Sequence, residues 1–427
     1  MSQYQKFIFK RYEFNKQEKT LDFYYGFDSE LTFKESYFLD FDFTAYDSKA
    51  LDRAIQLLFF VAGVSYFKAY LPPEIVVEAG EIDTQLAEFL NKTYQRGLGE
   101  FFYVNQLDPM TKISFPVNTE STQPLSFEVN GLLIGIGGGK DSLVSVEALR
   151  DTVGDLSTWS LGHKKQLSPL VERVGLPHYW VERNWDKSLL DHNTGGALNG
   201  HVPISAILAC AGVVTAILSG KHDVVVSNEA SANEPTLQYK GVWVNHQYSK
   251  SEEFEKDFQS LLNHYFTNSI RYYSLLRPLS ELKICELFAK SYFDKYNDVF
   301  SSCNRAFTHD SPGLFWDGKC SKCAFVFLAL TPFVPRENLE KLFGGKNLLL
   351  DPELETTYKN LLGIEGDKPL ECVGEIKESR SAMDLAKKQY QELQKYQYQI
   401  PSDYNYRAVA HHAIPPDIWR YVQAKIT

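Results

Sequence analysis

The stretch GLLIGIGGGKDSLVSVEALR, residues 131–150, joins a short apolar run to three consecutive glycines and then to Lys-Asp-Ser. A short continuous apolar run is typical of a buried strand, and the residues from Asp141 onward have the pattern of a helix. Glycines in such a turn let backbone N–H groups point at an anion, and the helix N-terminus adds positive potential. The stretch therefore predicts a strand–loop–helix unit that holds phosphate.

Two common phosphate motifs do not fit this loop. The dinucleotide motif G-x-G-x-x-G requires glycine at position 140, where Lys140 stands. The Walker motif requires glycine at 134 and Ser or Thr at 141, where Ile134 and Asp141 stand. Asp141 is suited to cap the helix or to bind Mg²⁺. The candidate ligands of the phosphate are Gly137, Gly138, Gly139, Lys140, Asp141 and Ser142.

The segments after the loop alternate between strand and helix patterns. Short strands are expected at 156–162, 176–184 and 222–229, and helices such as 203–220 lie between them. This alternation predicts an α/β fold with a parallel, doubly wound sheet, in which ligands bind at the carboxyl ends of the strands. The loops of interest begin at Gly137, Ser160 and Ser227.

The two ends of the chain have other patterns. Residues 1–125 alternate aromatic and polar positions, which predicts antiparallel strands in a β-rich N-terminal domain. A helix is expected before Pro72, and residues 116–124 form a turn-rich linker. Residues 126–345 form the predicted α/β domain that contains the phosphate loop, and residues 346–427 are charged and helical, as a C-terminal extension.

Composition narrows the function classes. The chain has 427 residues with a net charge of −10 and no block of Lys and Arg, so nucleic acid is not expected as its main partner. The first residues lack the apolar region of a secretory signal, and the longest apolar stretch, near 204–218, is too short to span a membrane. Six scattered cysteines do not form a disulfide framework. We expect a cytoplasmic protein with a small-molecule substrate and no membrane partner.

Further polar clusters follow the predicted strands. Asn199 and His201 precede an apolar helix, either as anion ligands or as helix caps. The polar loops after the strand at 222–226 are either solvated or part of a site, and their density near strand ends favours a site. Their candidates are Asn228, Glu229, Asn245, His246, Ser249 and Lys250.

Three cysteines lie close together in the sequence, in the last third of residues 126–345. Cys320 and Cys323 form a C-x-x-C pair, with Cys303 upstream. With His309 they could supply the four ligands that zinc prefers, although no second ligand pair of metal-site spacing is present. Packing of structural cysteines, a redox pair, or contacts of Arg305 and Lys322 with an anionic substrate are the alternatives.

The glycine loop resembles the pyrophosphate loop of the ATP pyrophosphatases, the PP-loop superfamily, whose usual pattern is S-G-G-x-D-S. The segment GGGKDS matches five of its six positions, with Gly137 in place of the first serine. This resemblance implies ATP and Mg²⁺ as cofactors, with Asp141 as metal ligand. It also implies cleavage between the α and β phosphates and an adenylated substrate.

A longer resemblance covers residues 126–380. The segments GGGKDS, LNGHVP, SNEASA, VNHQYSKS, SCNR, CSKCAFVFLAL and ECVGEIKE resemble the ATP-dependent UDP-N-acetylmuramoyl-L-alanyl-L-glutamate epimerases of peptidoglycan synthesis. This implies inversion of the terminal L-Glu to D-Glu through an acyl adenylate, with release of AMP and pyrophosphate. Two positions depart from the pattern: Ala230 stands where a basic residue is expected, and Asp317 stands near a place where a further cysteine is common.

Roles follow from this resemblance and from side-chain chemistry. Lys140 and Asp141 belong to the activation step, and Ser160 and Leu161 are expected near adenine. His246 is the first candidate for a base because an imidazole titrates near neutral pH, and Cys303 is the rival acid or base. Glu229 is a third catalytic candidate. Substrate ligands are expected among Asn199, His201, Asn228, Asn245, Ser249, Lys250, Arg305, Lys322 and Glu375. Alternative functions are an adenylating ligase or sulfurtransferase acting on tRNA or a small acid, and an ATP-binding regulatory module.

Overall fold

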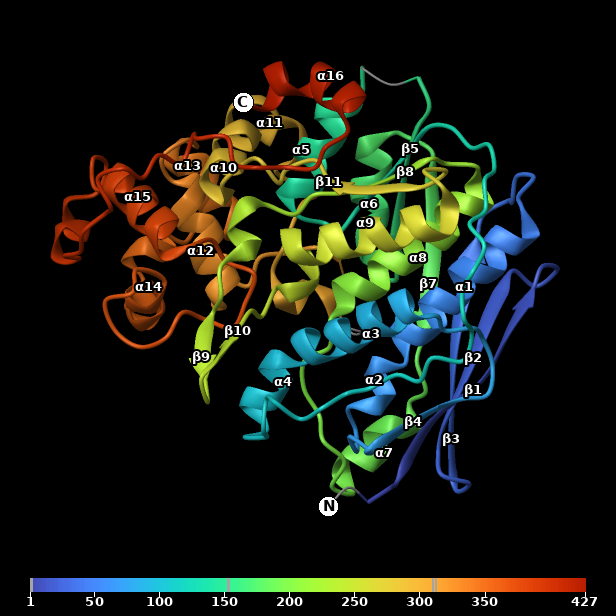
Figure 1. The fold of residues 1–427 in the computed structure, drawn as a ribbon. Coiled ribbons are helices and arrows are strands. Elements are labelled where there is room, and N and C mark those ends of the chain that lie inside the picture. Colours follow the sequence, from blue (N-terminus) through green and yellow to red (C-terminus); the bar gives the residue numbers. More distant parts are fainter. Residues whose placement is uncertain (1–2, 152–153, 309–310, 312) are drawn as a thin grey trace.

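The computed structural model describes residues 3–151, 154–308, 311 and 313–427. Its strands form one continuous sheet in the order β11-β8-β5-β6-β7-β3-β2-β1-β4, with helices on both faces (Figure 1). A separate hairpin pairs β9 (Leu237–Tyr239) with β10 (Val242–Val244). The expected α/β class is therefore confirmed.

Five neighbouring strands of the sheet are parallel. They are β5 (Leu132–Gly135), β6 (Leu156–Leu161), β7 (His178–Asn184), β8 (Asp223–Val226) and β11 (Arg271–Ser274). Numbered along the chain, their spatial order is 3-2-1-4-5, which is the order of a doubly wound sheet. The order reverses between β5 and β8, so the carboxyl ends of these two strands border the crevice in which such sheets bind ligands.

Alternating residues of the central strands face two different cores. Leu133 of β5 and Val224 of β8 belong to one buried cluster, while Ile134 and Val225 belong to the other. This is the two-residue period of a strand that is covered on both faces. The connecting helices are α5 (Lys140–Leu149), α6 (Lys164–Val174), α7 (Ser188–Thr194), α8 (Ile204–Ser219) and α9 (Glu252–Phe266).

The N-terminal strands extend the same sheet. The predicted antiparallel strands are present as β1 (Lys6–Asn15), β2 (Thr20–Phe27) and β3 (Leu31–Asp40), and β4 (Glu74–Val77) pairs in parallel with β1. β3 also pairs antiparallel with β7. Sheet and core therefore run across the boundary expected at residue 125, so residues 1–125 do not form a separate sheet, and the proposed domain limits stay a prediction.

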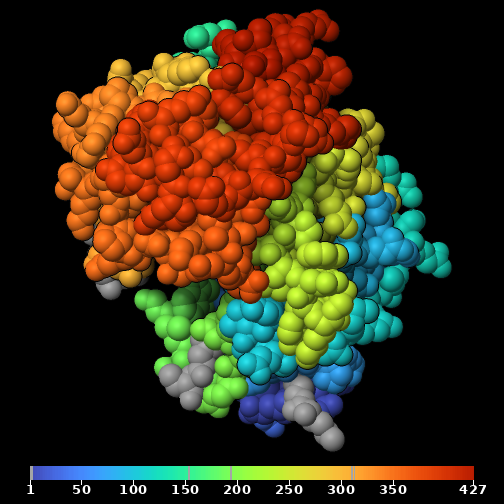
Figure 2. All heavy atoms as spheres, turned by 90° about the vertical axis from the view of Figure 1, so that its left-hand side faces the viewer, coloured from blue at the N-terminus to red at the C-terminus, as the bar shows by residue number. Residues whose placement is uncertain are grey.

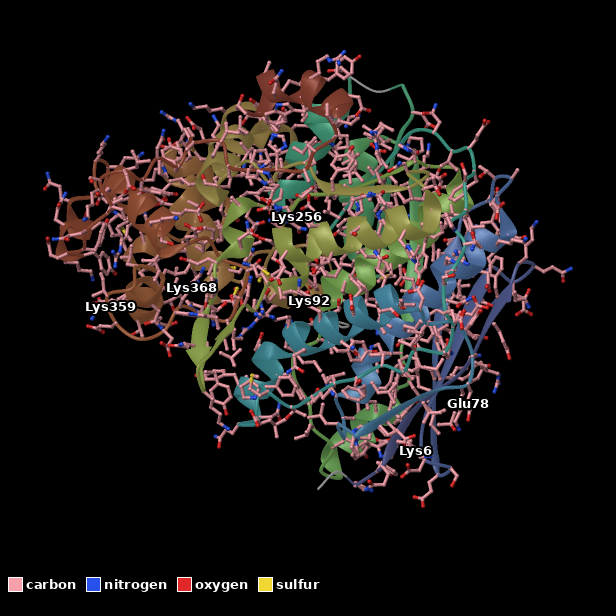
Figure 3. All side chains as sticks on the ribbon, in the orientation of Figure 1. Lys6, Glu78, Lys92, Lys256, Lys359 and Lys368 are labelled. Carbon is pink, nitrogen blue, oxygen red and sulfur yellow. The ribbon has the colours of Figure 1, made fainter. Side chains whose placement is uncertain are left out.

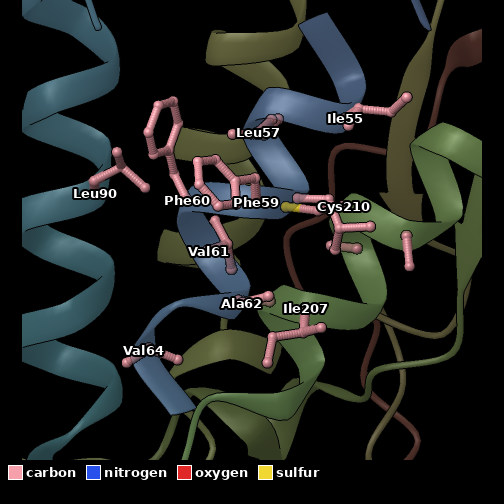
Figure 4. Close-up of a cluster of buried hydrophobic side chains, with 14 of the residues drawn as sticks. Ile55, Leu57, Phe59, Phe60, Val61, Ala62, Val64, Leu90, Ile207 and Cys210 are labelled. Atoms are coloured by element: carbon pink, nitrogen blue, oxygen red, sulfur yellow. The ribbon is translucent and has the colours of Figure 1, made fainter. Parts of the chain in front are cut away.

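A long apolar helix fills the core behind this sheet. α1 (Ser48–Ala62) and α2 (Val64–Phe67) lie between α3 (Thr84–Gly97) and α8, and Phe60 and Cys210 mark the two flanks (Figure 4). Residues 48–67 are long and apolar enough to span a membrane by composition alone, but most of this stretch is buried inside the protein. Taken together, α1 and α2 are therefore the longest apolar helical stretch in the described part of the chain, and not the stretch near 204–218 that the sequence suggested.

Ion pairs join the surface helices. The ammonium of Lys92 on α3 pairs with Asp257 of α9 at 2.5 Å, and both helices lie side by side near Lys92 (Figure 3). α4 (Gly99–Val104) follows α3 and carries Glu100 toward the site described below.

Helices after β11 cover one end of the molecule. They are α10 (Glu281–Ser291), α11 (Phe293–Tyr296), η3 (Asn304–Phe307), α12 (Ser321–Leu330), α13 (Arg336–Leu342), α14 (Glu355–Leu361), α15 (Ile376–Ala386) and α16 (Pro416–Ile426). Figure 2 shows these segments covering one face beside the β9–β10 hairpin. Residues 346–427, expected as a helical extension, contain α14, α15 and α16 together with segments that are not α-helical, so this extension stays a prediction.

Candidate active site

The glycine loop lies at the switch point of the sheet. It connects β5 to α5, and the loop after β8 lies beside it, since the hydroxyls of Ser145 and Ser227 are 2.7 Å apart. Gly138 has a φ of 89°, and a Cβ there would approach the ring of Phe307 to 2.7 Å. A Cβ on Gly137 would meet nothing within 4 Å. The loop is therefore closed on one side and open in front of Gly137.

The first turn of α5 has no side-chain cap. Gly139 occupies the N-cap position, and the hydroxyl of Ser142 donates to its carbonyl at 3.1 Å. The first N–H groups of an uncapped helix are donors without an intrahelical acceptor. Open space at Gly137 and free donors at the start of α5 are what an anion needs, so the predicted phosphate loop has a fitting geometry.

Lys140 is the buried cation of this loop. Only 4% of it is exposed, and its ammonium contacts Asp141 at 2.7 Å and Glu281 at 2.8 Å. Burial opposes its charge, but Asp141 and Glu281 raise the pKa of Lys140. Burial likewise opposes ionisation of Asp141, and Lys140 and Lys322 lower the pKa of that carboxyl. Lys140 and Asp141 are thus a charged pair at neutral pH, next to the open part of the loop.

Glu281 completes this group and was missed by the sequence reasoning. Its Oε2 is buried and has no hydrogen-bond partner among the described residues. Burial and the nearby Asp141 raise the pKa of Glu281 to about 7. Its backbone N–H donates to Glu378 at 2.7 Å. Ser280 caps α10 just before it, so the sequence around Glu281 looks like an ordinary helix start.

The loops after β8 and β10 bring a second cation into the same space. The ammonium of Lys250 lies 3.1 Å from the sulfur of Cys372. Its charge also interacts with Glu229 and Asp141. The ammonium of Lys322 donates to the carbonyl of Cys372. Lys250, Lys322 and Glu229, all predicted as site residues, are therefore gathered around Cys372 and the glycine loop.

A histidine pair on one carboxylate adjoins Cys372. Nδ1 of His246 contacts Glu100, and Nδ1 of His201 lies 3.3 Å from the same carboxylate. The two imidazole rings are 4.8 Å apart, and His246 also hydrogen-bonds Cys372. These contacts form a continuous chain from His201 through Glu100 and His246 to Cys372. Asn199, before His201, accepts a hydrogen bond from Lys68 at 3.2 Å.

The protonation states of the connected groups from His201 to Cys372 differ from those expected from the sequence. Burial opposes ionisation of Cys372, but Lys250 and His246 lower the pKa of its thiol to about 5. Burial also opposes the charge on His246, but Cys372 and Glu100 raise the pKa of this imidazole to about 9. Burial and His246 lower the pKa of His201 to about 4. At neutral pH Cys372 is a thiolate and His246 is protonated, so the raised pKa of His246 does not match the near-neutral pKa on which its prediction as a base rested. The role of His246 as a base stays a prediction.

Several predicted ligands have structural contacts. The amide of Asn245 donates to Ala232 and accepts from Gln247, so both of its ends are used within the loop. Glu375 caps α15 and pairs with Lys377. The hydroxyl of Ser160 lies 3.0 Å from His178. The carbonyl of Asn228 accepts from Ser274, while Ser249 is buried and Leu161 ends β6. Roles of these residues toward a ligand stay predictions.

Cys303 lies in a different group. Its sulfur is gathered with those of Cys320 and Cys323 and with the carboxylate of Asp317. The guanidinium of Arg305 is mostly exposed and lies 3.2 Å from Asp317. Cys303 thus has its contacts with this cluster, whereas the thiolate beside Lys250 is Cys372. His309, considered above as a zinc ligand, lies outside the described residues.

Cys372 and Glu100 were also missed by the sequence reasoning. Cys372 stands inside the segment ECVGEIKE, which carried the family resemblance, but no spacing linked it to His246. Glu100 belongs to the N-terminal segment and looks like a residue of an exposed helix. A surface depression of about 840 Å³, lined among others by Asp155 and His222, lies at the amino ends of the strands and away from these groups.

Two family models and three relatives match most of this chain. Residues 1–275 match the model of the MurL N-terminal domain, and residues 299–401 match that of the MurL C-terminal domain. A relative from Xanthomonas oryzae pv. oryzae (strain MAFF 311018) is 41% identical over 398 residues, which cover 88% of this chain and 87% of the relative. Its name is UDP-N-acetyl-alpha-D-muramoyl-L-alanyl-L-glutamate epimerase.

Two further relatives have the same name. One from Salinispora tropica is 40% identical over 338 residues, covering 78% of this chain and 73% of the relative. One from Micromonospora sp. (strain ATCC 39149) is 41% identical over 344 residues, covering 80% of this chain and 76% of the relative. One family model matches more than half of the chain, and the three relatives are 40–41% identical to it over 78–88% of its length. The chain therefore belongs to the MurL family.

Proposed function

We propose that this chain inverts the α-carbon of the terminal L-glutamate in UDP-N-acetylmuramoyl-L-alanyl-L-glutamate, and that ATP activates the glutamate for this inversion. Three relatives that match most of the chain are named for this epimerisation. The strand order and the glycine loop support a place in the PP-loop ATP pyrophosphatase superfamily. A cytoplasmic location in peptidoglycan precursor synthesis belongs to the same proposal.

One observation carries the proposal. The sulfur of Cys372, a thiolate with a lowered pKa, lies 3.1 Å from the ammonium of Lys250. The charge of Lys250 also lowers the pKa of Asp141 in the glycine loop. An acid–base group and a phosphate-type loop therefore share one space. A ligase or a regulatory ATP module needs the loop but has no use for a thiolate poised for proton transfer.

Activation is needed because the α-proton of a carboxylate is only weakly acidic. Its removal would place a second negative charge beside the first. We infer that the α-carboxylate of the glutamate attacks the α-phosphorus of ATP. The bond from this phosphorus to the oxygen that bridges the α- and β-phosphates then breaks, and pyrophosphate leaves. Gly137, Gly138, Gly139, Lys140 and Ser142 would hold the phosphates, and Asp141 would hold Mg²⁺, because the loop is open and its helix uncapped.

Inversion then moves one proton off the α-carbon and another onto it. Cys372 takes the α-proton as a thiolate and becomes a thiol, and the enolate oxygen is stabilised by the nearby cations Lys250 and Lys322. His246, protonated between Cys372 and Glu100, keeps the thiolate charged before the transfer.

The group on the other face has to return the proton. Our candidate is Glu229, whose carboxyl group interacts with both Lys250 and Glu281. It would donate a proton taken from solvent as a carboxylic acid and be left as a carboxylate, while the Cys372 thiol returns the proton it took to solvent. Water then cleaves the mixed anhydride to the carboxylate of D-glutamate and AMP. The net reaction consumes ATP and water and yields AMP, pyrophosphate and the epimer.

A product analysis tests the proposal. The protein is incubated with ATP, Mg²⁺ and UDP-N-acetylmuramoyl-L-alanyl-L-glutamate. AMP and pyrophosphate are quantified directly in the reaction mixture, and D-glutamate is quantified after acid hydrolysis of the peptide. We expect D-glutamate to form only with ATP, together with AMP and pyrophosphate. Pyrophosphate without D-glutamate would favour a ligase, and ATP binding without turnover would favour a regulatory module.

A further inference from the structure

We propose that Cys303, Asp317, Cys320 and Cys323 bind one zinc ion. This ion holds in place Ser301 and Phe307, which form the cover of the glycine loop. One ligand atom from each of these side chains lies within 4.8 Å of all the others. Cys303 and Cys323 are fully buried, and the side chain of Asp317 is 8% exposed. Four donors that converge in a buried space have the number and type that a structural zinc site uses.

The contacts inside the cluster leave one donor atom unused. Oδ1 of Asp317 accepts from the backbone N–H of Lys319 at 2.9 Å and from the Cys323 thiol at 3.1 Å. Oδ2 of Asp317 is buried and has no hydrogen bond among the described residues, although Arg305 lies 3.2 Å away. A buried carboxylate oxygen without a hydrogen bond is costly, and coordination of a cation would remove that cost.

The donor set selects the ion. Thiolates are soft ligands, which favour zinc and disfavour Mg²⁺ and Ca²⁺. With Zn–S bonds of about 2.3 Å, a tetrahedral site has sulfur atoms about 3.8 Å apart, so the observed grouping needs only a small contraction. Simple packing of cysteines in a core does not account for the grouping of three sulfur atoms with a carboxylate. Cys210 is an example of a packed cysteine, since it lies among apolar side chains of α1 and α8 (Figure 4).

The position of the cluster gives the ion its role. Cys303 directly follows Ser301 and Ser302, and the backbone N–H of Ser301 donates to the carbonyl of Gly138 at 3.0 Å. Phe307, in the short helix after Cys303, packs over Gly138. Lys322 lies between Cys320 and Cys323 in the sequence, and its ammonium donates to the carbonyl of Cys372. One ion would thus tie the cover of the phosphate loop to a cation of the acid–base group.

Metal content of the full-length protein tests the site. The protein is expressed with added zinc, purified under reducing conditions without a metal-affinity tag, and analysed by inductively coupled plasma mass spectrometry. We expect about one zinc per chain, as in other structural sites. X-ray absorption should show about three sulfur ligands near 2.3 Å and an oxygen ligand near 2.0 Å. Less than a tenth of this content, or a Cys320–Cys323 disulfide in the reduced preparation, would overturn the proposal.

Variants and cobalt separate zinc loss from misfolding. Cys320→Ser and Asp317→Ala should lower the zinc content several-fold, while Cys210→Ala should keep it. Cobalt added to the reduced, metal-free wild type should give the intense visible bands of tetrahedral thiolate coordination, and this readout needs no variant. Wild type that binds no cobalt, or Asp317→Ala protein that keeps full zinc content with the same absorption spectrum, would contradict the four-ligand site.

Discussion

The sulfur of Cys372 lies 3.1 Å from the ammonium of Lys250, although the two residues are 122 positions apart in the chain. Burial alone would keep this thiol neutral, since a charge is costly in a buried space. The ammonium on one side and the protonated His246 on the other reverse this preference. The fold therefore holds a thiolate beside the glycine loop, and this arrangement leads to the predictions below.

Replacing Cys372 by serine should abolish inversion while leaving activation largely intact. Serine keeps the size of the side chain, but its hydroxyl does not ionise at neutral pH. We expect kcat/KM for D-glutamate formation to fall by about 10²–10⁴-fold, as for loss of a general base. Substrate-dependent exchange of labelled pyrophosphate into ATP should persist. Cys210→Ala is the matched cysteine control, and equal loss of both activities in Cys372→Ser would contradict a proton-transfer role.

Replacing Glu229 by glutamine should uncouple proton exchange from inversion. If Glu229 serves one face and Cys372 the other, the variant still removes the α-proton from one epimer but cannot deliver it to the opposite face. In D₂O, one of the two epimers should gain deuterium with retention of configuration, and inversion should fall at least tenfold. Full inversion by this variant would remove Glu229 from the mechanism.

The pH dependence of kcat/KM should be bell-shaped. Activity needs the Cys372 thiolate, whose pKa is lowered to about 5, and the protonated His246, whose pKa is raised to about 9. The value of kcat/KM should therefore rise as the pH passes about 5 and fall as it passes about 9. Because Cys372 and His246 interact, these two pKa values describe the titration of the pair and not of either residue alone. A single rising limb near the ordinary thiol pKa would contradict the thiolate–imidazolium pair.

Two neighbouring glycines should respond differently to substitution. Gly137→Ser introduces the serine that the S-G-G-x-D-S pattern has at this position, and its Cβ meets no protein atom within 4 Å, so we expect pyrophosphate release within about threefold of wild type. Gly138→Ala adds a Cβ at a φ of 89° against Phe307, which costs about 1–3 kcal/mol in backbone strain alone. Its KM for ATP should rise and its melting temperature fall. The same behaviour in both variants would show that the loop does not bind phosphate as proposed.

Stability should depend on pH through Glu378. Burial and Glu375 raise its pKa to about 8, well above the value of 4.5 in an exposed chain. Between these values the native state holds a proton that the unfolded state has lost, so this group makes the protein less stable as the pH rises. Glu378→Gln removes the effect.

Urea unfolding of wild type and Glu378→Gln at pH 5.5 and 7.5 measures this contribution. The wild type should lose about 1–3 kcal/mol relative to the variant over this interval, because one pKa unit corresponds to about 1.4 kcal/mol. A difference between the two proteins that does not change with pH would show that Glu378 does not hold its proton.

Local patterns predicted the elements but not all of their neighbours. The apolar run before Gly137 and the two-residue period of residues 6–40 predicted strands that the structure contains. Periodicity says which face of a strand is buried and nothing about which strand lies beside it. The pairing of β3 with β7, which makes one sheet of the two regions, therefore could not be predicted.

The site shows the same limit. Lys140, Asp141 and Lys250 stand in polar or glycine-rich loops after strands, where a composition signal exists. Glu281 and Cys372 lie in segments that look like ordinary helix starts and turns, and only the fold brings them to the loop. The protonation of His246 depends on Glu100 and Cys372, so its usual pKa was a poor guide to its protonation state in the fold.

The central claim is that the glutamate is activated by ATP and then loses and regains its α-proton at this site. The most direct measurement is solvent deuterium at the α-carbon of the product in D₂O, read by mass spectrometry beside AMP and pyrophosphate. We predict one deuterium in each D-glutamate formed, no D-glutamate without ATP, and about 10²–10⁴-fold slower formation of the deuterated product with Cys372→Ser. D-glutamate that forms without solvent deuterium, or with deuterium in the absence of ATP, would contradict the account.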